Sequence, residues 1–151
     1  MTEQLPQKDI KNFPEPYLVD RIGVMLGGRV AELTLLGNLS SGAANDLKEA
    51  TKLATHMVSQ FGMSKLLGSV YYQKGEEHVF LGREMGMPKD FNEAIAKLID
   101  DEVRRIITEK EKEMVEFFNA HKDKLVALSD KLIVQETMYA DEIKSVMGLS
   151  L

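Results

Sequence analysis

A carboxylate at the start of a helical pattern is the side chain in this sequence best placed to bind a ligand. Asp46 follows a run of small residues that includes Gly42, Ala43 and Ala44. One interpretation is a capping box, in which Asp46 accepts a hydrogen bond from an unpaired backbone N–H and Glu49 reaches back. The other is an outward-facing metal ligand or base, because its neighbours are too small to cover it. Residue types alone favour the capping box.

The histidines do not complete a metal site with this aspartate. No two of His56, His78 and His121 have the spacing that would place a metal-binding pair on one helical face. His56 follows Asp46 on the same predicted helix, about 15 Å away along its axis, so the two cannot bind one ion. A weaker alternative brings His78 from a loop toward Asp46, but two ligands make a poor zinc site. The sequence has no cysteine, which removes thiolate ligands, thiolate nucleophiles and disulfides. We therefore identify no complete catalytic set.

Composition limits the class of protein. A chain of 151 residues with 44% hydrophobic and 28% charged residues is typical of one soluble globular domain. A net charge of −5 argues against a nucleic-acid ligand, since phosphates require a basic face. No signal peptide is visible, and no apolar run approaches the roughly 20 residues that span a bilayer. We expect a soluble, cytosolic type of protein.

Apolar residues at three- and four-residue spacing predict a mainly α fold. Helices are predicted from Tyr17 onward, over 46–61, over 91–118, after His121 and over 140–147. The short break before His121 predicts an antiparallel hairpin of long helices at the C-terminus. Residues 69–82 form at most a short β-hairpin, or a loop.

Four details refine this prediction. Gly23, Gly27 and Gly28 interrupt the first helical pattern, which favours close helix–helix contact over a break. Gly62 is predicted to end the second helix, and Asp90 to cap the third. The charged run 109–113 is interpreted as a solvated helix face.

Several short segments then occur in a characteristic order. They are Leu18–Ile22, Met25–Glu32, Ser41–Leu47, Met57–Val58, Phe61–Ser64, Val79–Arg83, Ile99–Ile107 and Glu136–Thr137. In this order they resemble the FtsH family of ATP-dependent zinc metalloproteases, from about Gln4 to the C-terminus. The resemblance implies a helical peptidase domain over 1–151: an extended arm (1–13), a helical region with the aspartate ligand (14–62), a loop or hairpin (63–88) and a helical bundle (89–151).

The resemblance also implies a metal site. In that family, zinc is bound by the two histidines of a His-Glu-x-x-His helix and by the aspartate of a Gly-Ala-x-Asn-Asp segment, which corresponds to Asp46. The glutamate of the histidine motif acts as general base on zinc-bound water. No His-Glu-x-x-His and no Gly-x-x-x-x-Gly-Lys-Ser/Thr occurs in this sequence. Leu33 stands where the family usually has a second acid after Glu32, so no role is assigned to either.

Two functions from different classes follow. The first is the C-terminal part of an FtsH-type peptidase domain whose parent is a membrane-anchored hexamer at the inner face of the membrane. ATP would act in a separate AAA module, and the parent would degrade membrane and cytosolic proteins. The second is a stand-alone, proteolytically inactive helical interaction or regulatory module. For the purified chain we predict no stoichiometric zinc, no caseinolytic activity, and association or partial disorder near residues 14–45, where an apolar surface lacks its usual cover.

Overall fold

The regular elements of the computed structural model, which describes residues 12–72 and 93–148, are all helical. In chain order they are α1 (Glu15–Leu36), a short 3-10 helix η1 (Ser41–Ala43), α2 (Ala44–Ser59), α3 (Glu93–Ala120), α4 (Lys122–Gln135) and α5 (Ala140–Met147). The mainly α prediction is confirmed. Residues 69–72 are not in a strand, and the rest of the proposed hairpin lies outside the described residues, as do Asp90 and His78.

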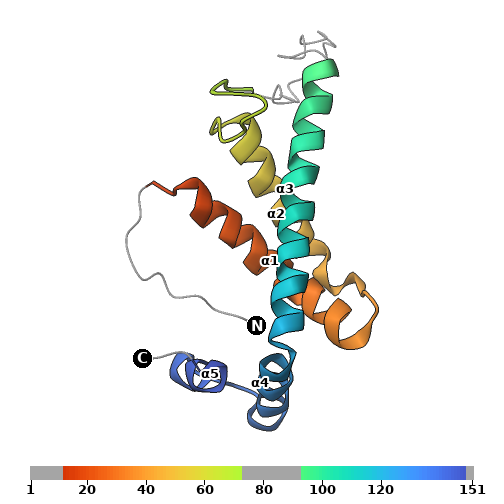
Figure 1. Cartoon of the computed structure of the whole chain (residues 1–151), viewed down its shortest axis with the longest axis vertical. Coiled ribbons are helices and arrows are strands. Elements are labelled where there is room, and N and C mark those ends of the chain that lie inside the picture. Colours follow the sequence, from red (N-terminus) through yellow and green to blue (C-terminus); the bar gives the residue numbers. More distant parts are fainter. Residues whose placement is uncertain (1–11, 73–92, 149–151) are drawn as a thin grey trace, which may run out of the picture.

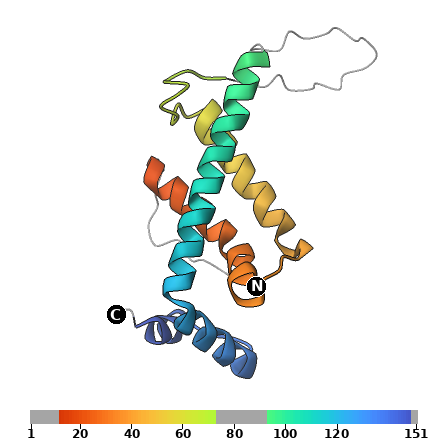
Figure 2. The same ribbon diagram turned by 45° about the vertical axis from the view of Figure 1, so that its right-hand side comes forward.

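The core lies where α1, α2 and α3 pack together (Figure 1). The long helix α3 runs alongside both others, as the turned view also shows (Figure 2). Each helix contributes one apolar face, with residues three or four apart. The buried members are Leu18, Ile22, Leu26 and Val30 of α1; Ala50, Ala54, Met57 and Val58 of α2; and Ile99, Val103 and Ile106 of α3.

Helix α1 continues through all three of its glycines. A Cβ atom at Gly23 would lie 2.6 Å from Cε of Lys110 on α3, whereas no atom lies within 4 Å of one at Gly27 or Gly28. Close helix contact is therefore the correct interpretation at Gly23. The other two glycines make no such approach among the described residues.

Two left-handed glycines follow the ends of α1 and α2. Gly37 has φ 68° and donates its backbone N–H to the Leu33 carbonyl at 3.1 Å, which ends α1. Helix α2 ends at Ser59, before Gly62, which has φ 63° and allows the chain to turn back toward Ser69. The predicted helix, which ran to residue 61 and ended at Gly62, was two residues too long.

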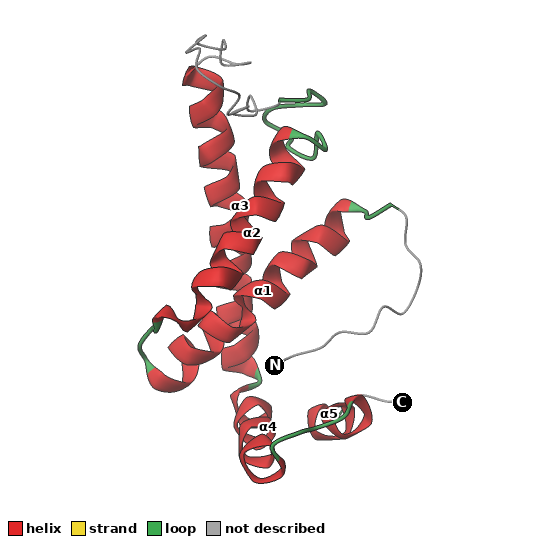
Figure 3. Cartoon of the chain, turned by 180° about the vertical axis from the view of Figure 1, so that it is seen from behind, coloured by secondary structure: helices red, strands yellow, loops and turns green. Residues whose placement is uncertain are grey.

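The C-terminal hairpin pairs α4 with α5, not α3 with α4 as predicted. Lys124, near the start of α4, donates to the carbonyl oxygen of Met147 at the end of α5 at 2.7 Å, so these two helices are antiparallel. Seen from behind, α4 and α5 lie beyond the end of α3 (Figure 3). The break at His121 redirects the chain here, and the His121 ring Nδ1 lies 2.8 Å from the Phe117 carbonyl oxygen.

Among the described residues, none of the helices has the length and apolar character needed to cross a membrane.

Candidate functional site

The turn between α1 and α2 is held to the end of α1 by one carboxylate. Ser40 donates its backbone N–H to Oε2 of Glu32 at 3.0 Å, and its hydroxyl lies 2.9 Å and 3.0 Å from the two carboxylate oxygens. The same hydroxyl accepts a hydrogen bond from the backbone N–H of Gly42 at 3.2 Å. Ser40 therefore caps η1 while it is bound to α1.

Helix α2 begins directly after this capped turn. Ala43 is its N-cap, makes no side-chain cap and is only 6% exposed. Asp46 lies within the first helical turn, three residues past the cap. The predicted capping box of Asp46 and Glu49 is therefore wrong, because the capping side chain of this turn is Ser40, which lies further upstream.

The Asp46 carboxylate is exposed and has no hydrogen bond or ion pair with any of the described residues. Its place in the first turn of α2 is stabilising for a negative charge, since the unpaired N–H groups of a helix carry partial positive charge. An ionised carboxylate only accepts hydrogen bonds and binds metals through oxygen. The structure thus presents Asp46 outward, as the ligand interpretation requires.

The histidines give Asp46 no partner within the described part of the chain. His56 lies in the last turn of α2, at the opposite end from Asp46, with its ring 6.2 Å from that of Phe61. His121 lies beyond α3, with its ring 4.5 Å from that of Phe117. Residues 12–72 and 93–148 contain no group of three side chains that could hold a metal ion. Asp46 fits zinc as one oxygen ligand, and these residues do not form the rest of a zinc site.

A buried carboxylate, paired with a half-exposed arginine, anchors the loop that follows α2. Glu102 of α3 is 6% exposed and accepts from Arg105 at 2.8 Å and 2.9 Å. The hydroxyl of Ser64 donates to the same carboxylate at 3.1 Å, and it also accepts from the backbone N–H groups of Leu66 and Leu67. The hydrogen bonds from Arg105, more than that from Ser64, hold the pKa of Glu102 below its ordinary value despite burial.

The charged run 109–113 was predicted to be a solvated helix face. This prediction is wrong at Lys110, which is only 6% exposed. Its ammonium group donates to Asp20 of α1 at 3.0 Å and to Glu113 at 2.9 Å. Burial lowers the pKa of Lys110, but the two carboxylates more than offset this, so the pKa is raised. The alternating charges of this run gave no sign that Lys110 is buried. Its side chain packs against α1 at Gly23, where the absence of a Cβ leaves room for it.

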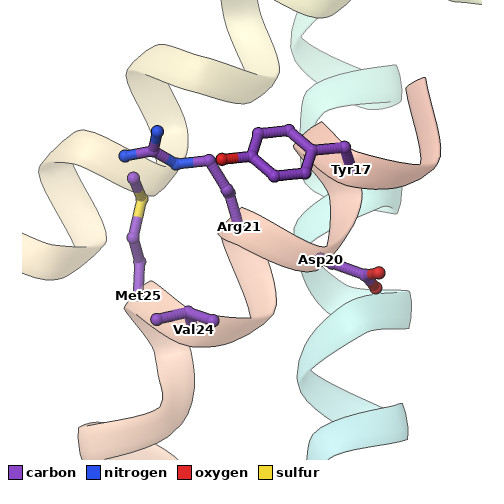
Figure 4. A pocket seen from close by; sticks show the side chains of 5 residues that line it. All are labelled: Tyr17, Asp20, Arg21, Val24 and Met25. Carbon is purple, nitrogen blue, oxygen red and sulfur yellow. The ribbon is translucent and has the colours of Figure 1, made fainter. Parts of the chain in front are cut away.

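A shallow groove of about 160 Å³ lies along α1, lined by Tyr17, Asp20, Arg21, Val24 and Met25. Tyr17, Arg21 and Met25 extend to one side of the helix, and Asp20 points to the other (Figure 4). Asp46 is not part of this groove. The groove combines an apolar floor with one guanidinium group and contains no metal-binding set.

Comparison with known proteins gives consistent matches along almost the whole chain. Residues 1–146 match the family described as Peptidase family M41. The chain is 45% identical over 146 residues to the ATP-dependent zinc metalloprotease FtsH of Nitrosococcus oceani, covering 97% of this chain and 23% of that protein. It is 48% identical over 147 residues to the protein of the same name from Marinobacter nauticus, again with 97% and 23% coverage. The chain thus spans about a quarter of the length of these relatives.

Proposed function

Because this chain belongs to peptidase family M41, we propose that it is the C-terminal portion of an ATP-dependent zinc metalloendopeptidase and supplies Asp46 as a zinc ligand. The family assignment agrees with the segment order that resembles FtsH and with the helical fold. The relatives' names state zinc, ATP dependence and proteolysis for those proteins. We extend those properties to the protein of which this chain would form a part.

The observation that carries this proposal is that the Asp46 carboxylate is exposed and unpaired among the described residues. It lies in the first turn of α2 and pairs with neither a backbone N–H nor a cation in the described parts of the chain, so both of its oxygens are open to a ligand. An exposed acceptor at a fixed helix start is suited to a metal that arrives with its other ligands. Two histidines from a His-Glu-x-x-His helix, outside the printed sequence, would complete the set.

Zinc held in this way would activate a water molecule and polarise a peptide carbonyl. The part of this chain in that chemistry is limited to one oxygen ligand and the scaffold that holds it. The parent protein would be a membrane-anchored hexamer acting on membrane and soluble proteins, with ATP used in a separate module.

A chimera tests the proposal. This chain replaces the segment that it matches in the Nitrosococcus oceani FtsH, and ATP-dependent hydrolysis of casein is measured. We expect activity in the chimera and its loss in Asp46→Ala, with normal activity in Lys48→Ala, at an exposed position of the same helix, as a neighbouring control. An active Asp46→Ala chimera would contradict the ligand role.

A second candidate, an inactive helical interaction module, is favoured by one observation. The end of α4 exposes Ile133 at 75% and Val134 at 82%. Such side chains suit a protein contact. A chimera that folds, binds zinc and remains inactive would favour this candidate.

A further inference from the structure

Among the described residues, Glu32 of α1 is the acidic side chain that hydrogen-bonds to the turn before Asp46. It lies in the last turns of α1, and both of its carboxylate oxygens accept from Ser40. A carboxylate engaged by two donors on one residue is oriented by them. Asp46, in contrast, has both oxygens free among the described residues.

The contact continues from Ser40 into the start of α2. Ser40 uses its hydroxyl proton toward Glu32 and the oxygen lone pair toward the Gly42 N–H, at 3.2 Å. A Cβ atom at Gly42 would lie 3.2 Å from Oγ of Ser40, so the turn is tightly closed there. The next residue, Ala43, is buried, and α2 begins at Ala44. The position of the first turn of α2 therefore depends on the hydrogen bonds that Glu32 accepts.

We propose that Glu32 is a positioning residue for the zinc ligand, acting through Ser40 and not by touching the metal. This rests on the proposed function, in which Asp46 binds zinc. Glu32 accepts hydrogen bonds from Ser40, and Ser40 caps the η1 turn. The position of this turn sets where α2 begins, and so the position and direction of the Asp46 side chain. Groups bonded directly to a metal ligand change metal affinity by about 10- to 100-fold, and Ser40 and Glu32 act one step further out, so we expect a smaller loss.

Four variants of the FtsH chimera separate this role from its alternatives. Glu32→Gln leaves one acceptor oxygen for two donors, and Ser40→Ala removes the hydroxyl. Ser40→Thr keeps the hydroxyl and serves as the conservative rescue. Ser41→Ala removes a neighbouring hydroxyl for which the structure shows no side-chain hydrogen bond, and it is the matched control.

Zinc affinity is measured by competition with a chelator, and ligand geometry by the visible absorption of the cobalt-substituted protein. We expect Glu32→Gln and Ser40→Ala to weaken zinc binding by roughly threefold to tenfold and to alter the cobalt spectrum. Ser40→Thr and Ser41→Ala should match the unmodified chimera in both measurements. A purely structural role would lower thermal stability without changing the cobalt spectrum of the folded fraction.

Three outcomes overturn the inference. If Glu32→Gln and Ser40→Ala bind zinc normally while Asp46→Ala does not, the positioning role is wrong and the proposed function stands. If Asp46→Ala binds zinc normally, the proposed function fails as well. If Glu32→Gln loses zinc and Ser40→Ala retains it, Glu32 touches the metal itself.

The 151-residue chain supplies a second measurement that does not depend on zinc. Amide hydrogen exchange at Gly42 should accelerate several-fold in Glu32→Gln and Ser40→Ala, with unchanged exchange in the core of α3. Equal Gly42 exchange in all variants would contradict the linkage through Ser40.

Discussion

The side chain of Lys110 on α3 packs against α1 at Gly23. A Cβ atom at Gly23 would lie 2.6 Å from Cε of Lys110 and 3.3 Å from Sδ of Met114. A Cβ here would require the Lys110 side chain to shift, since α1 is regular through this residue. This packing brings the buried ammonium group to Asp20, and this ion pair joins the first helix of the core to the last. The Lys110 side chain therefore occupies space that a side chain at position 23 would take.

Replacing Gly23 should consequently destabilise the chain. Alanine is the better helix former by about 1 kcal/mol, but overpacking at this contact costs about 1–3 kcal/mol. We expect Gly23→Ala to lower the free energy of unfolding by roughly 1 kcal/mol, as measured by urea denaturation. Gly28→Ala, where a Cβ meets no atom within 4 Å, is the matched control. It should raise the free energy by about 0.5–1 kcal/mol. Equal effects of the two substitutions would contradict the claim that the contact between Lys110 and Gly23 leaves no room for a Cβ.

The Glu102 cluster predicts a pH dependence of stability. The pKa of Glu102 is lowered in the folded state, so its contribution is full above the ordinary glutamate pKa. That contribution is lost as the pH falls through the lowered, folded-state pKa. At pH 7, Glu102→Gln should cost about 1–3 kcal/mol, since it disrupts hydrogen bonds of a buried charged group.

Urea titrations at a series of pH values from 7 down to 3 test this prediction. The difference between Glu102→Gln and the unmodified chain should shrink as the pH falls. Asp101→Asn, at an exposed neighbouring position, should stay within about 0.5 kcal/mol of the unmodified chain. A Glu102→Gln deficit that is the same at every pH would show that the carboxylate charge is not what stabilises the loop.

We also expect the isolated chain to associate through α1. Val24 is 69% exposed and Leu36 68% exposed, both on a helix whose opposite face is already in the core. Size-exclusion chromatography with light scattering should give a mass above that of the monomer. Val24→Lys with Leu36→Lys should lower that mass, and the matched pair Ile133→Lys with Val134→Lys tests the α4 surface. A monomeric unmodified chain would refute the prediction.

Periodicity accounts for most of the fold that could be predicted. The apolar spacing located α1, α2 and α3 because each has a single buried face, as in Leu18, Ile22 and Leu26. It could not show which helices pair, so the C-terminal hairpin was assigned to α3 and α4. That choice depends on the direction of the chain after His121, which apolar spacing does not encode.

The candidate site was predicted in part. Asp46 was singled out by its small neighbours and by the order of the family-like segments; the structure places it exposed in the first turn of α2, and its role as a ligand stays a prediction. The capping box was wrong because Ser40, six residues earlier, closes the turn together with Glu32 on the preceding helix. Contacts between residues eight apart across a loop leave no periodic signal. The burial of Lys110 was missed for the same reason, since it depends on Gly23, far away in the sequence.

The central claim is that Asp46 is one zinc ligand whose partners lie outside this polypeptide. Metal analysis of purified protein tests it most directly. We predict no stoichiometric zinc in the 151-residue chain, one zinc per subunit in the FtsH chimera, and none in the Asp46→Ala chimera. Stoichiometric zinc and caseinolytic activity in the chain alone, both lost in Asp46→Ala, would contradict the claim that the remaining ligands are elsewhere. Full zinc in the Asp46→Ala chimera would contradict the role of Asp46 itself.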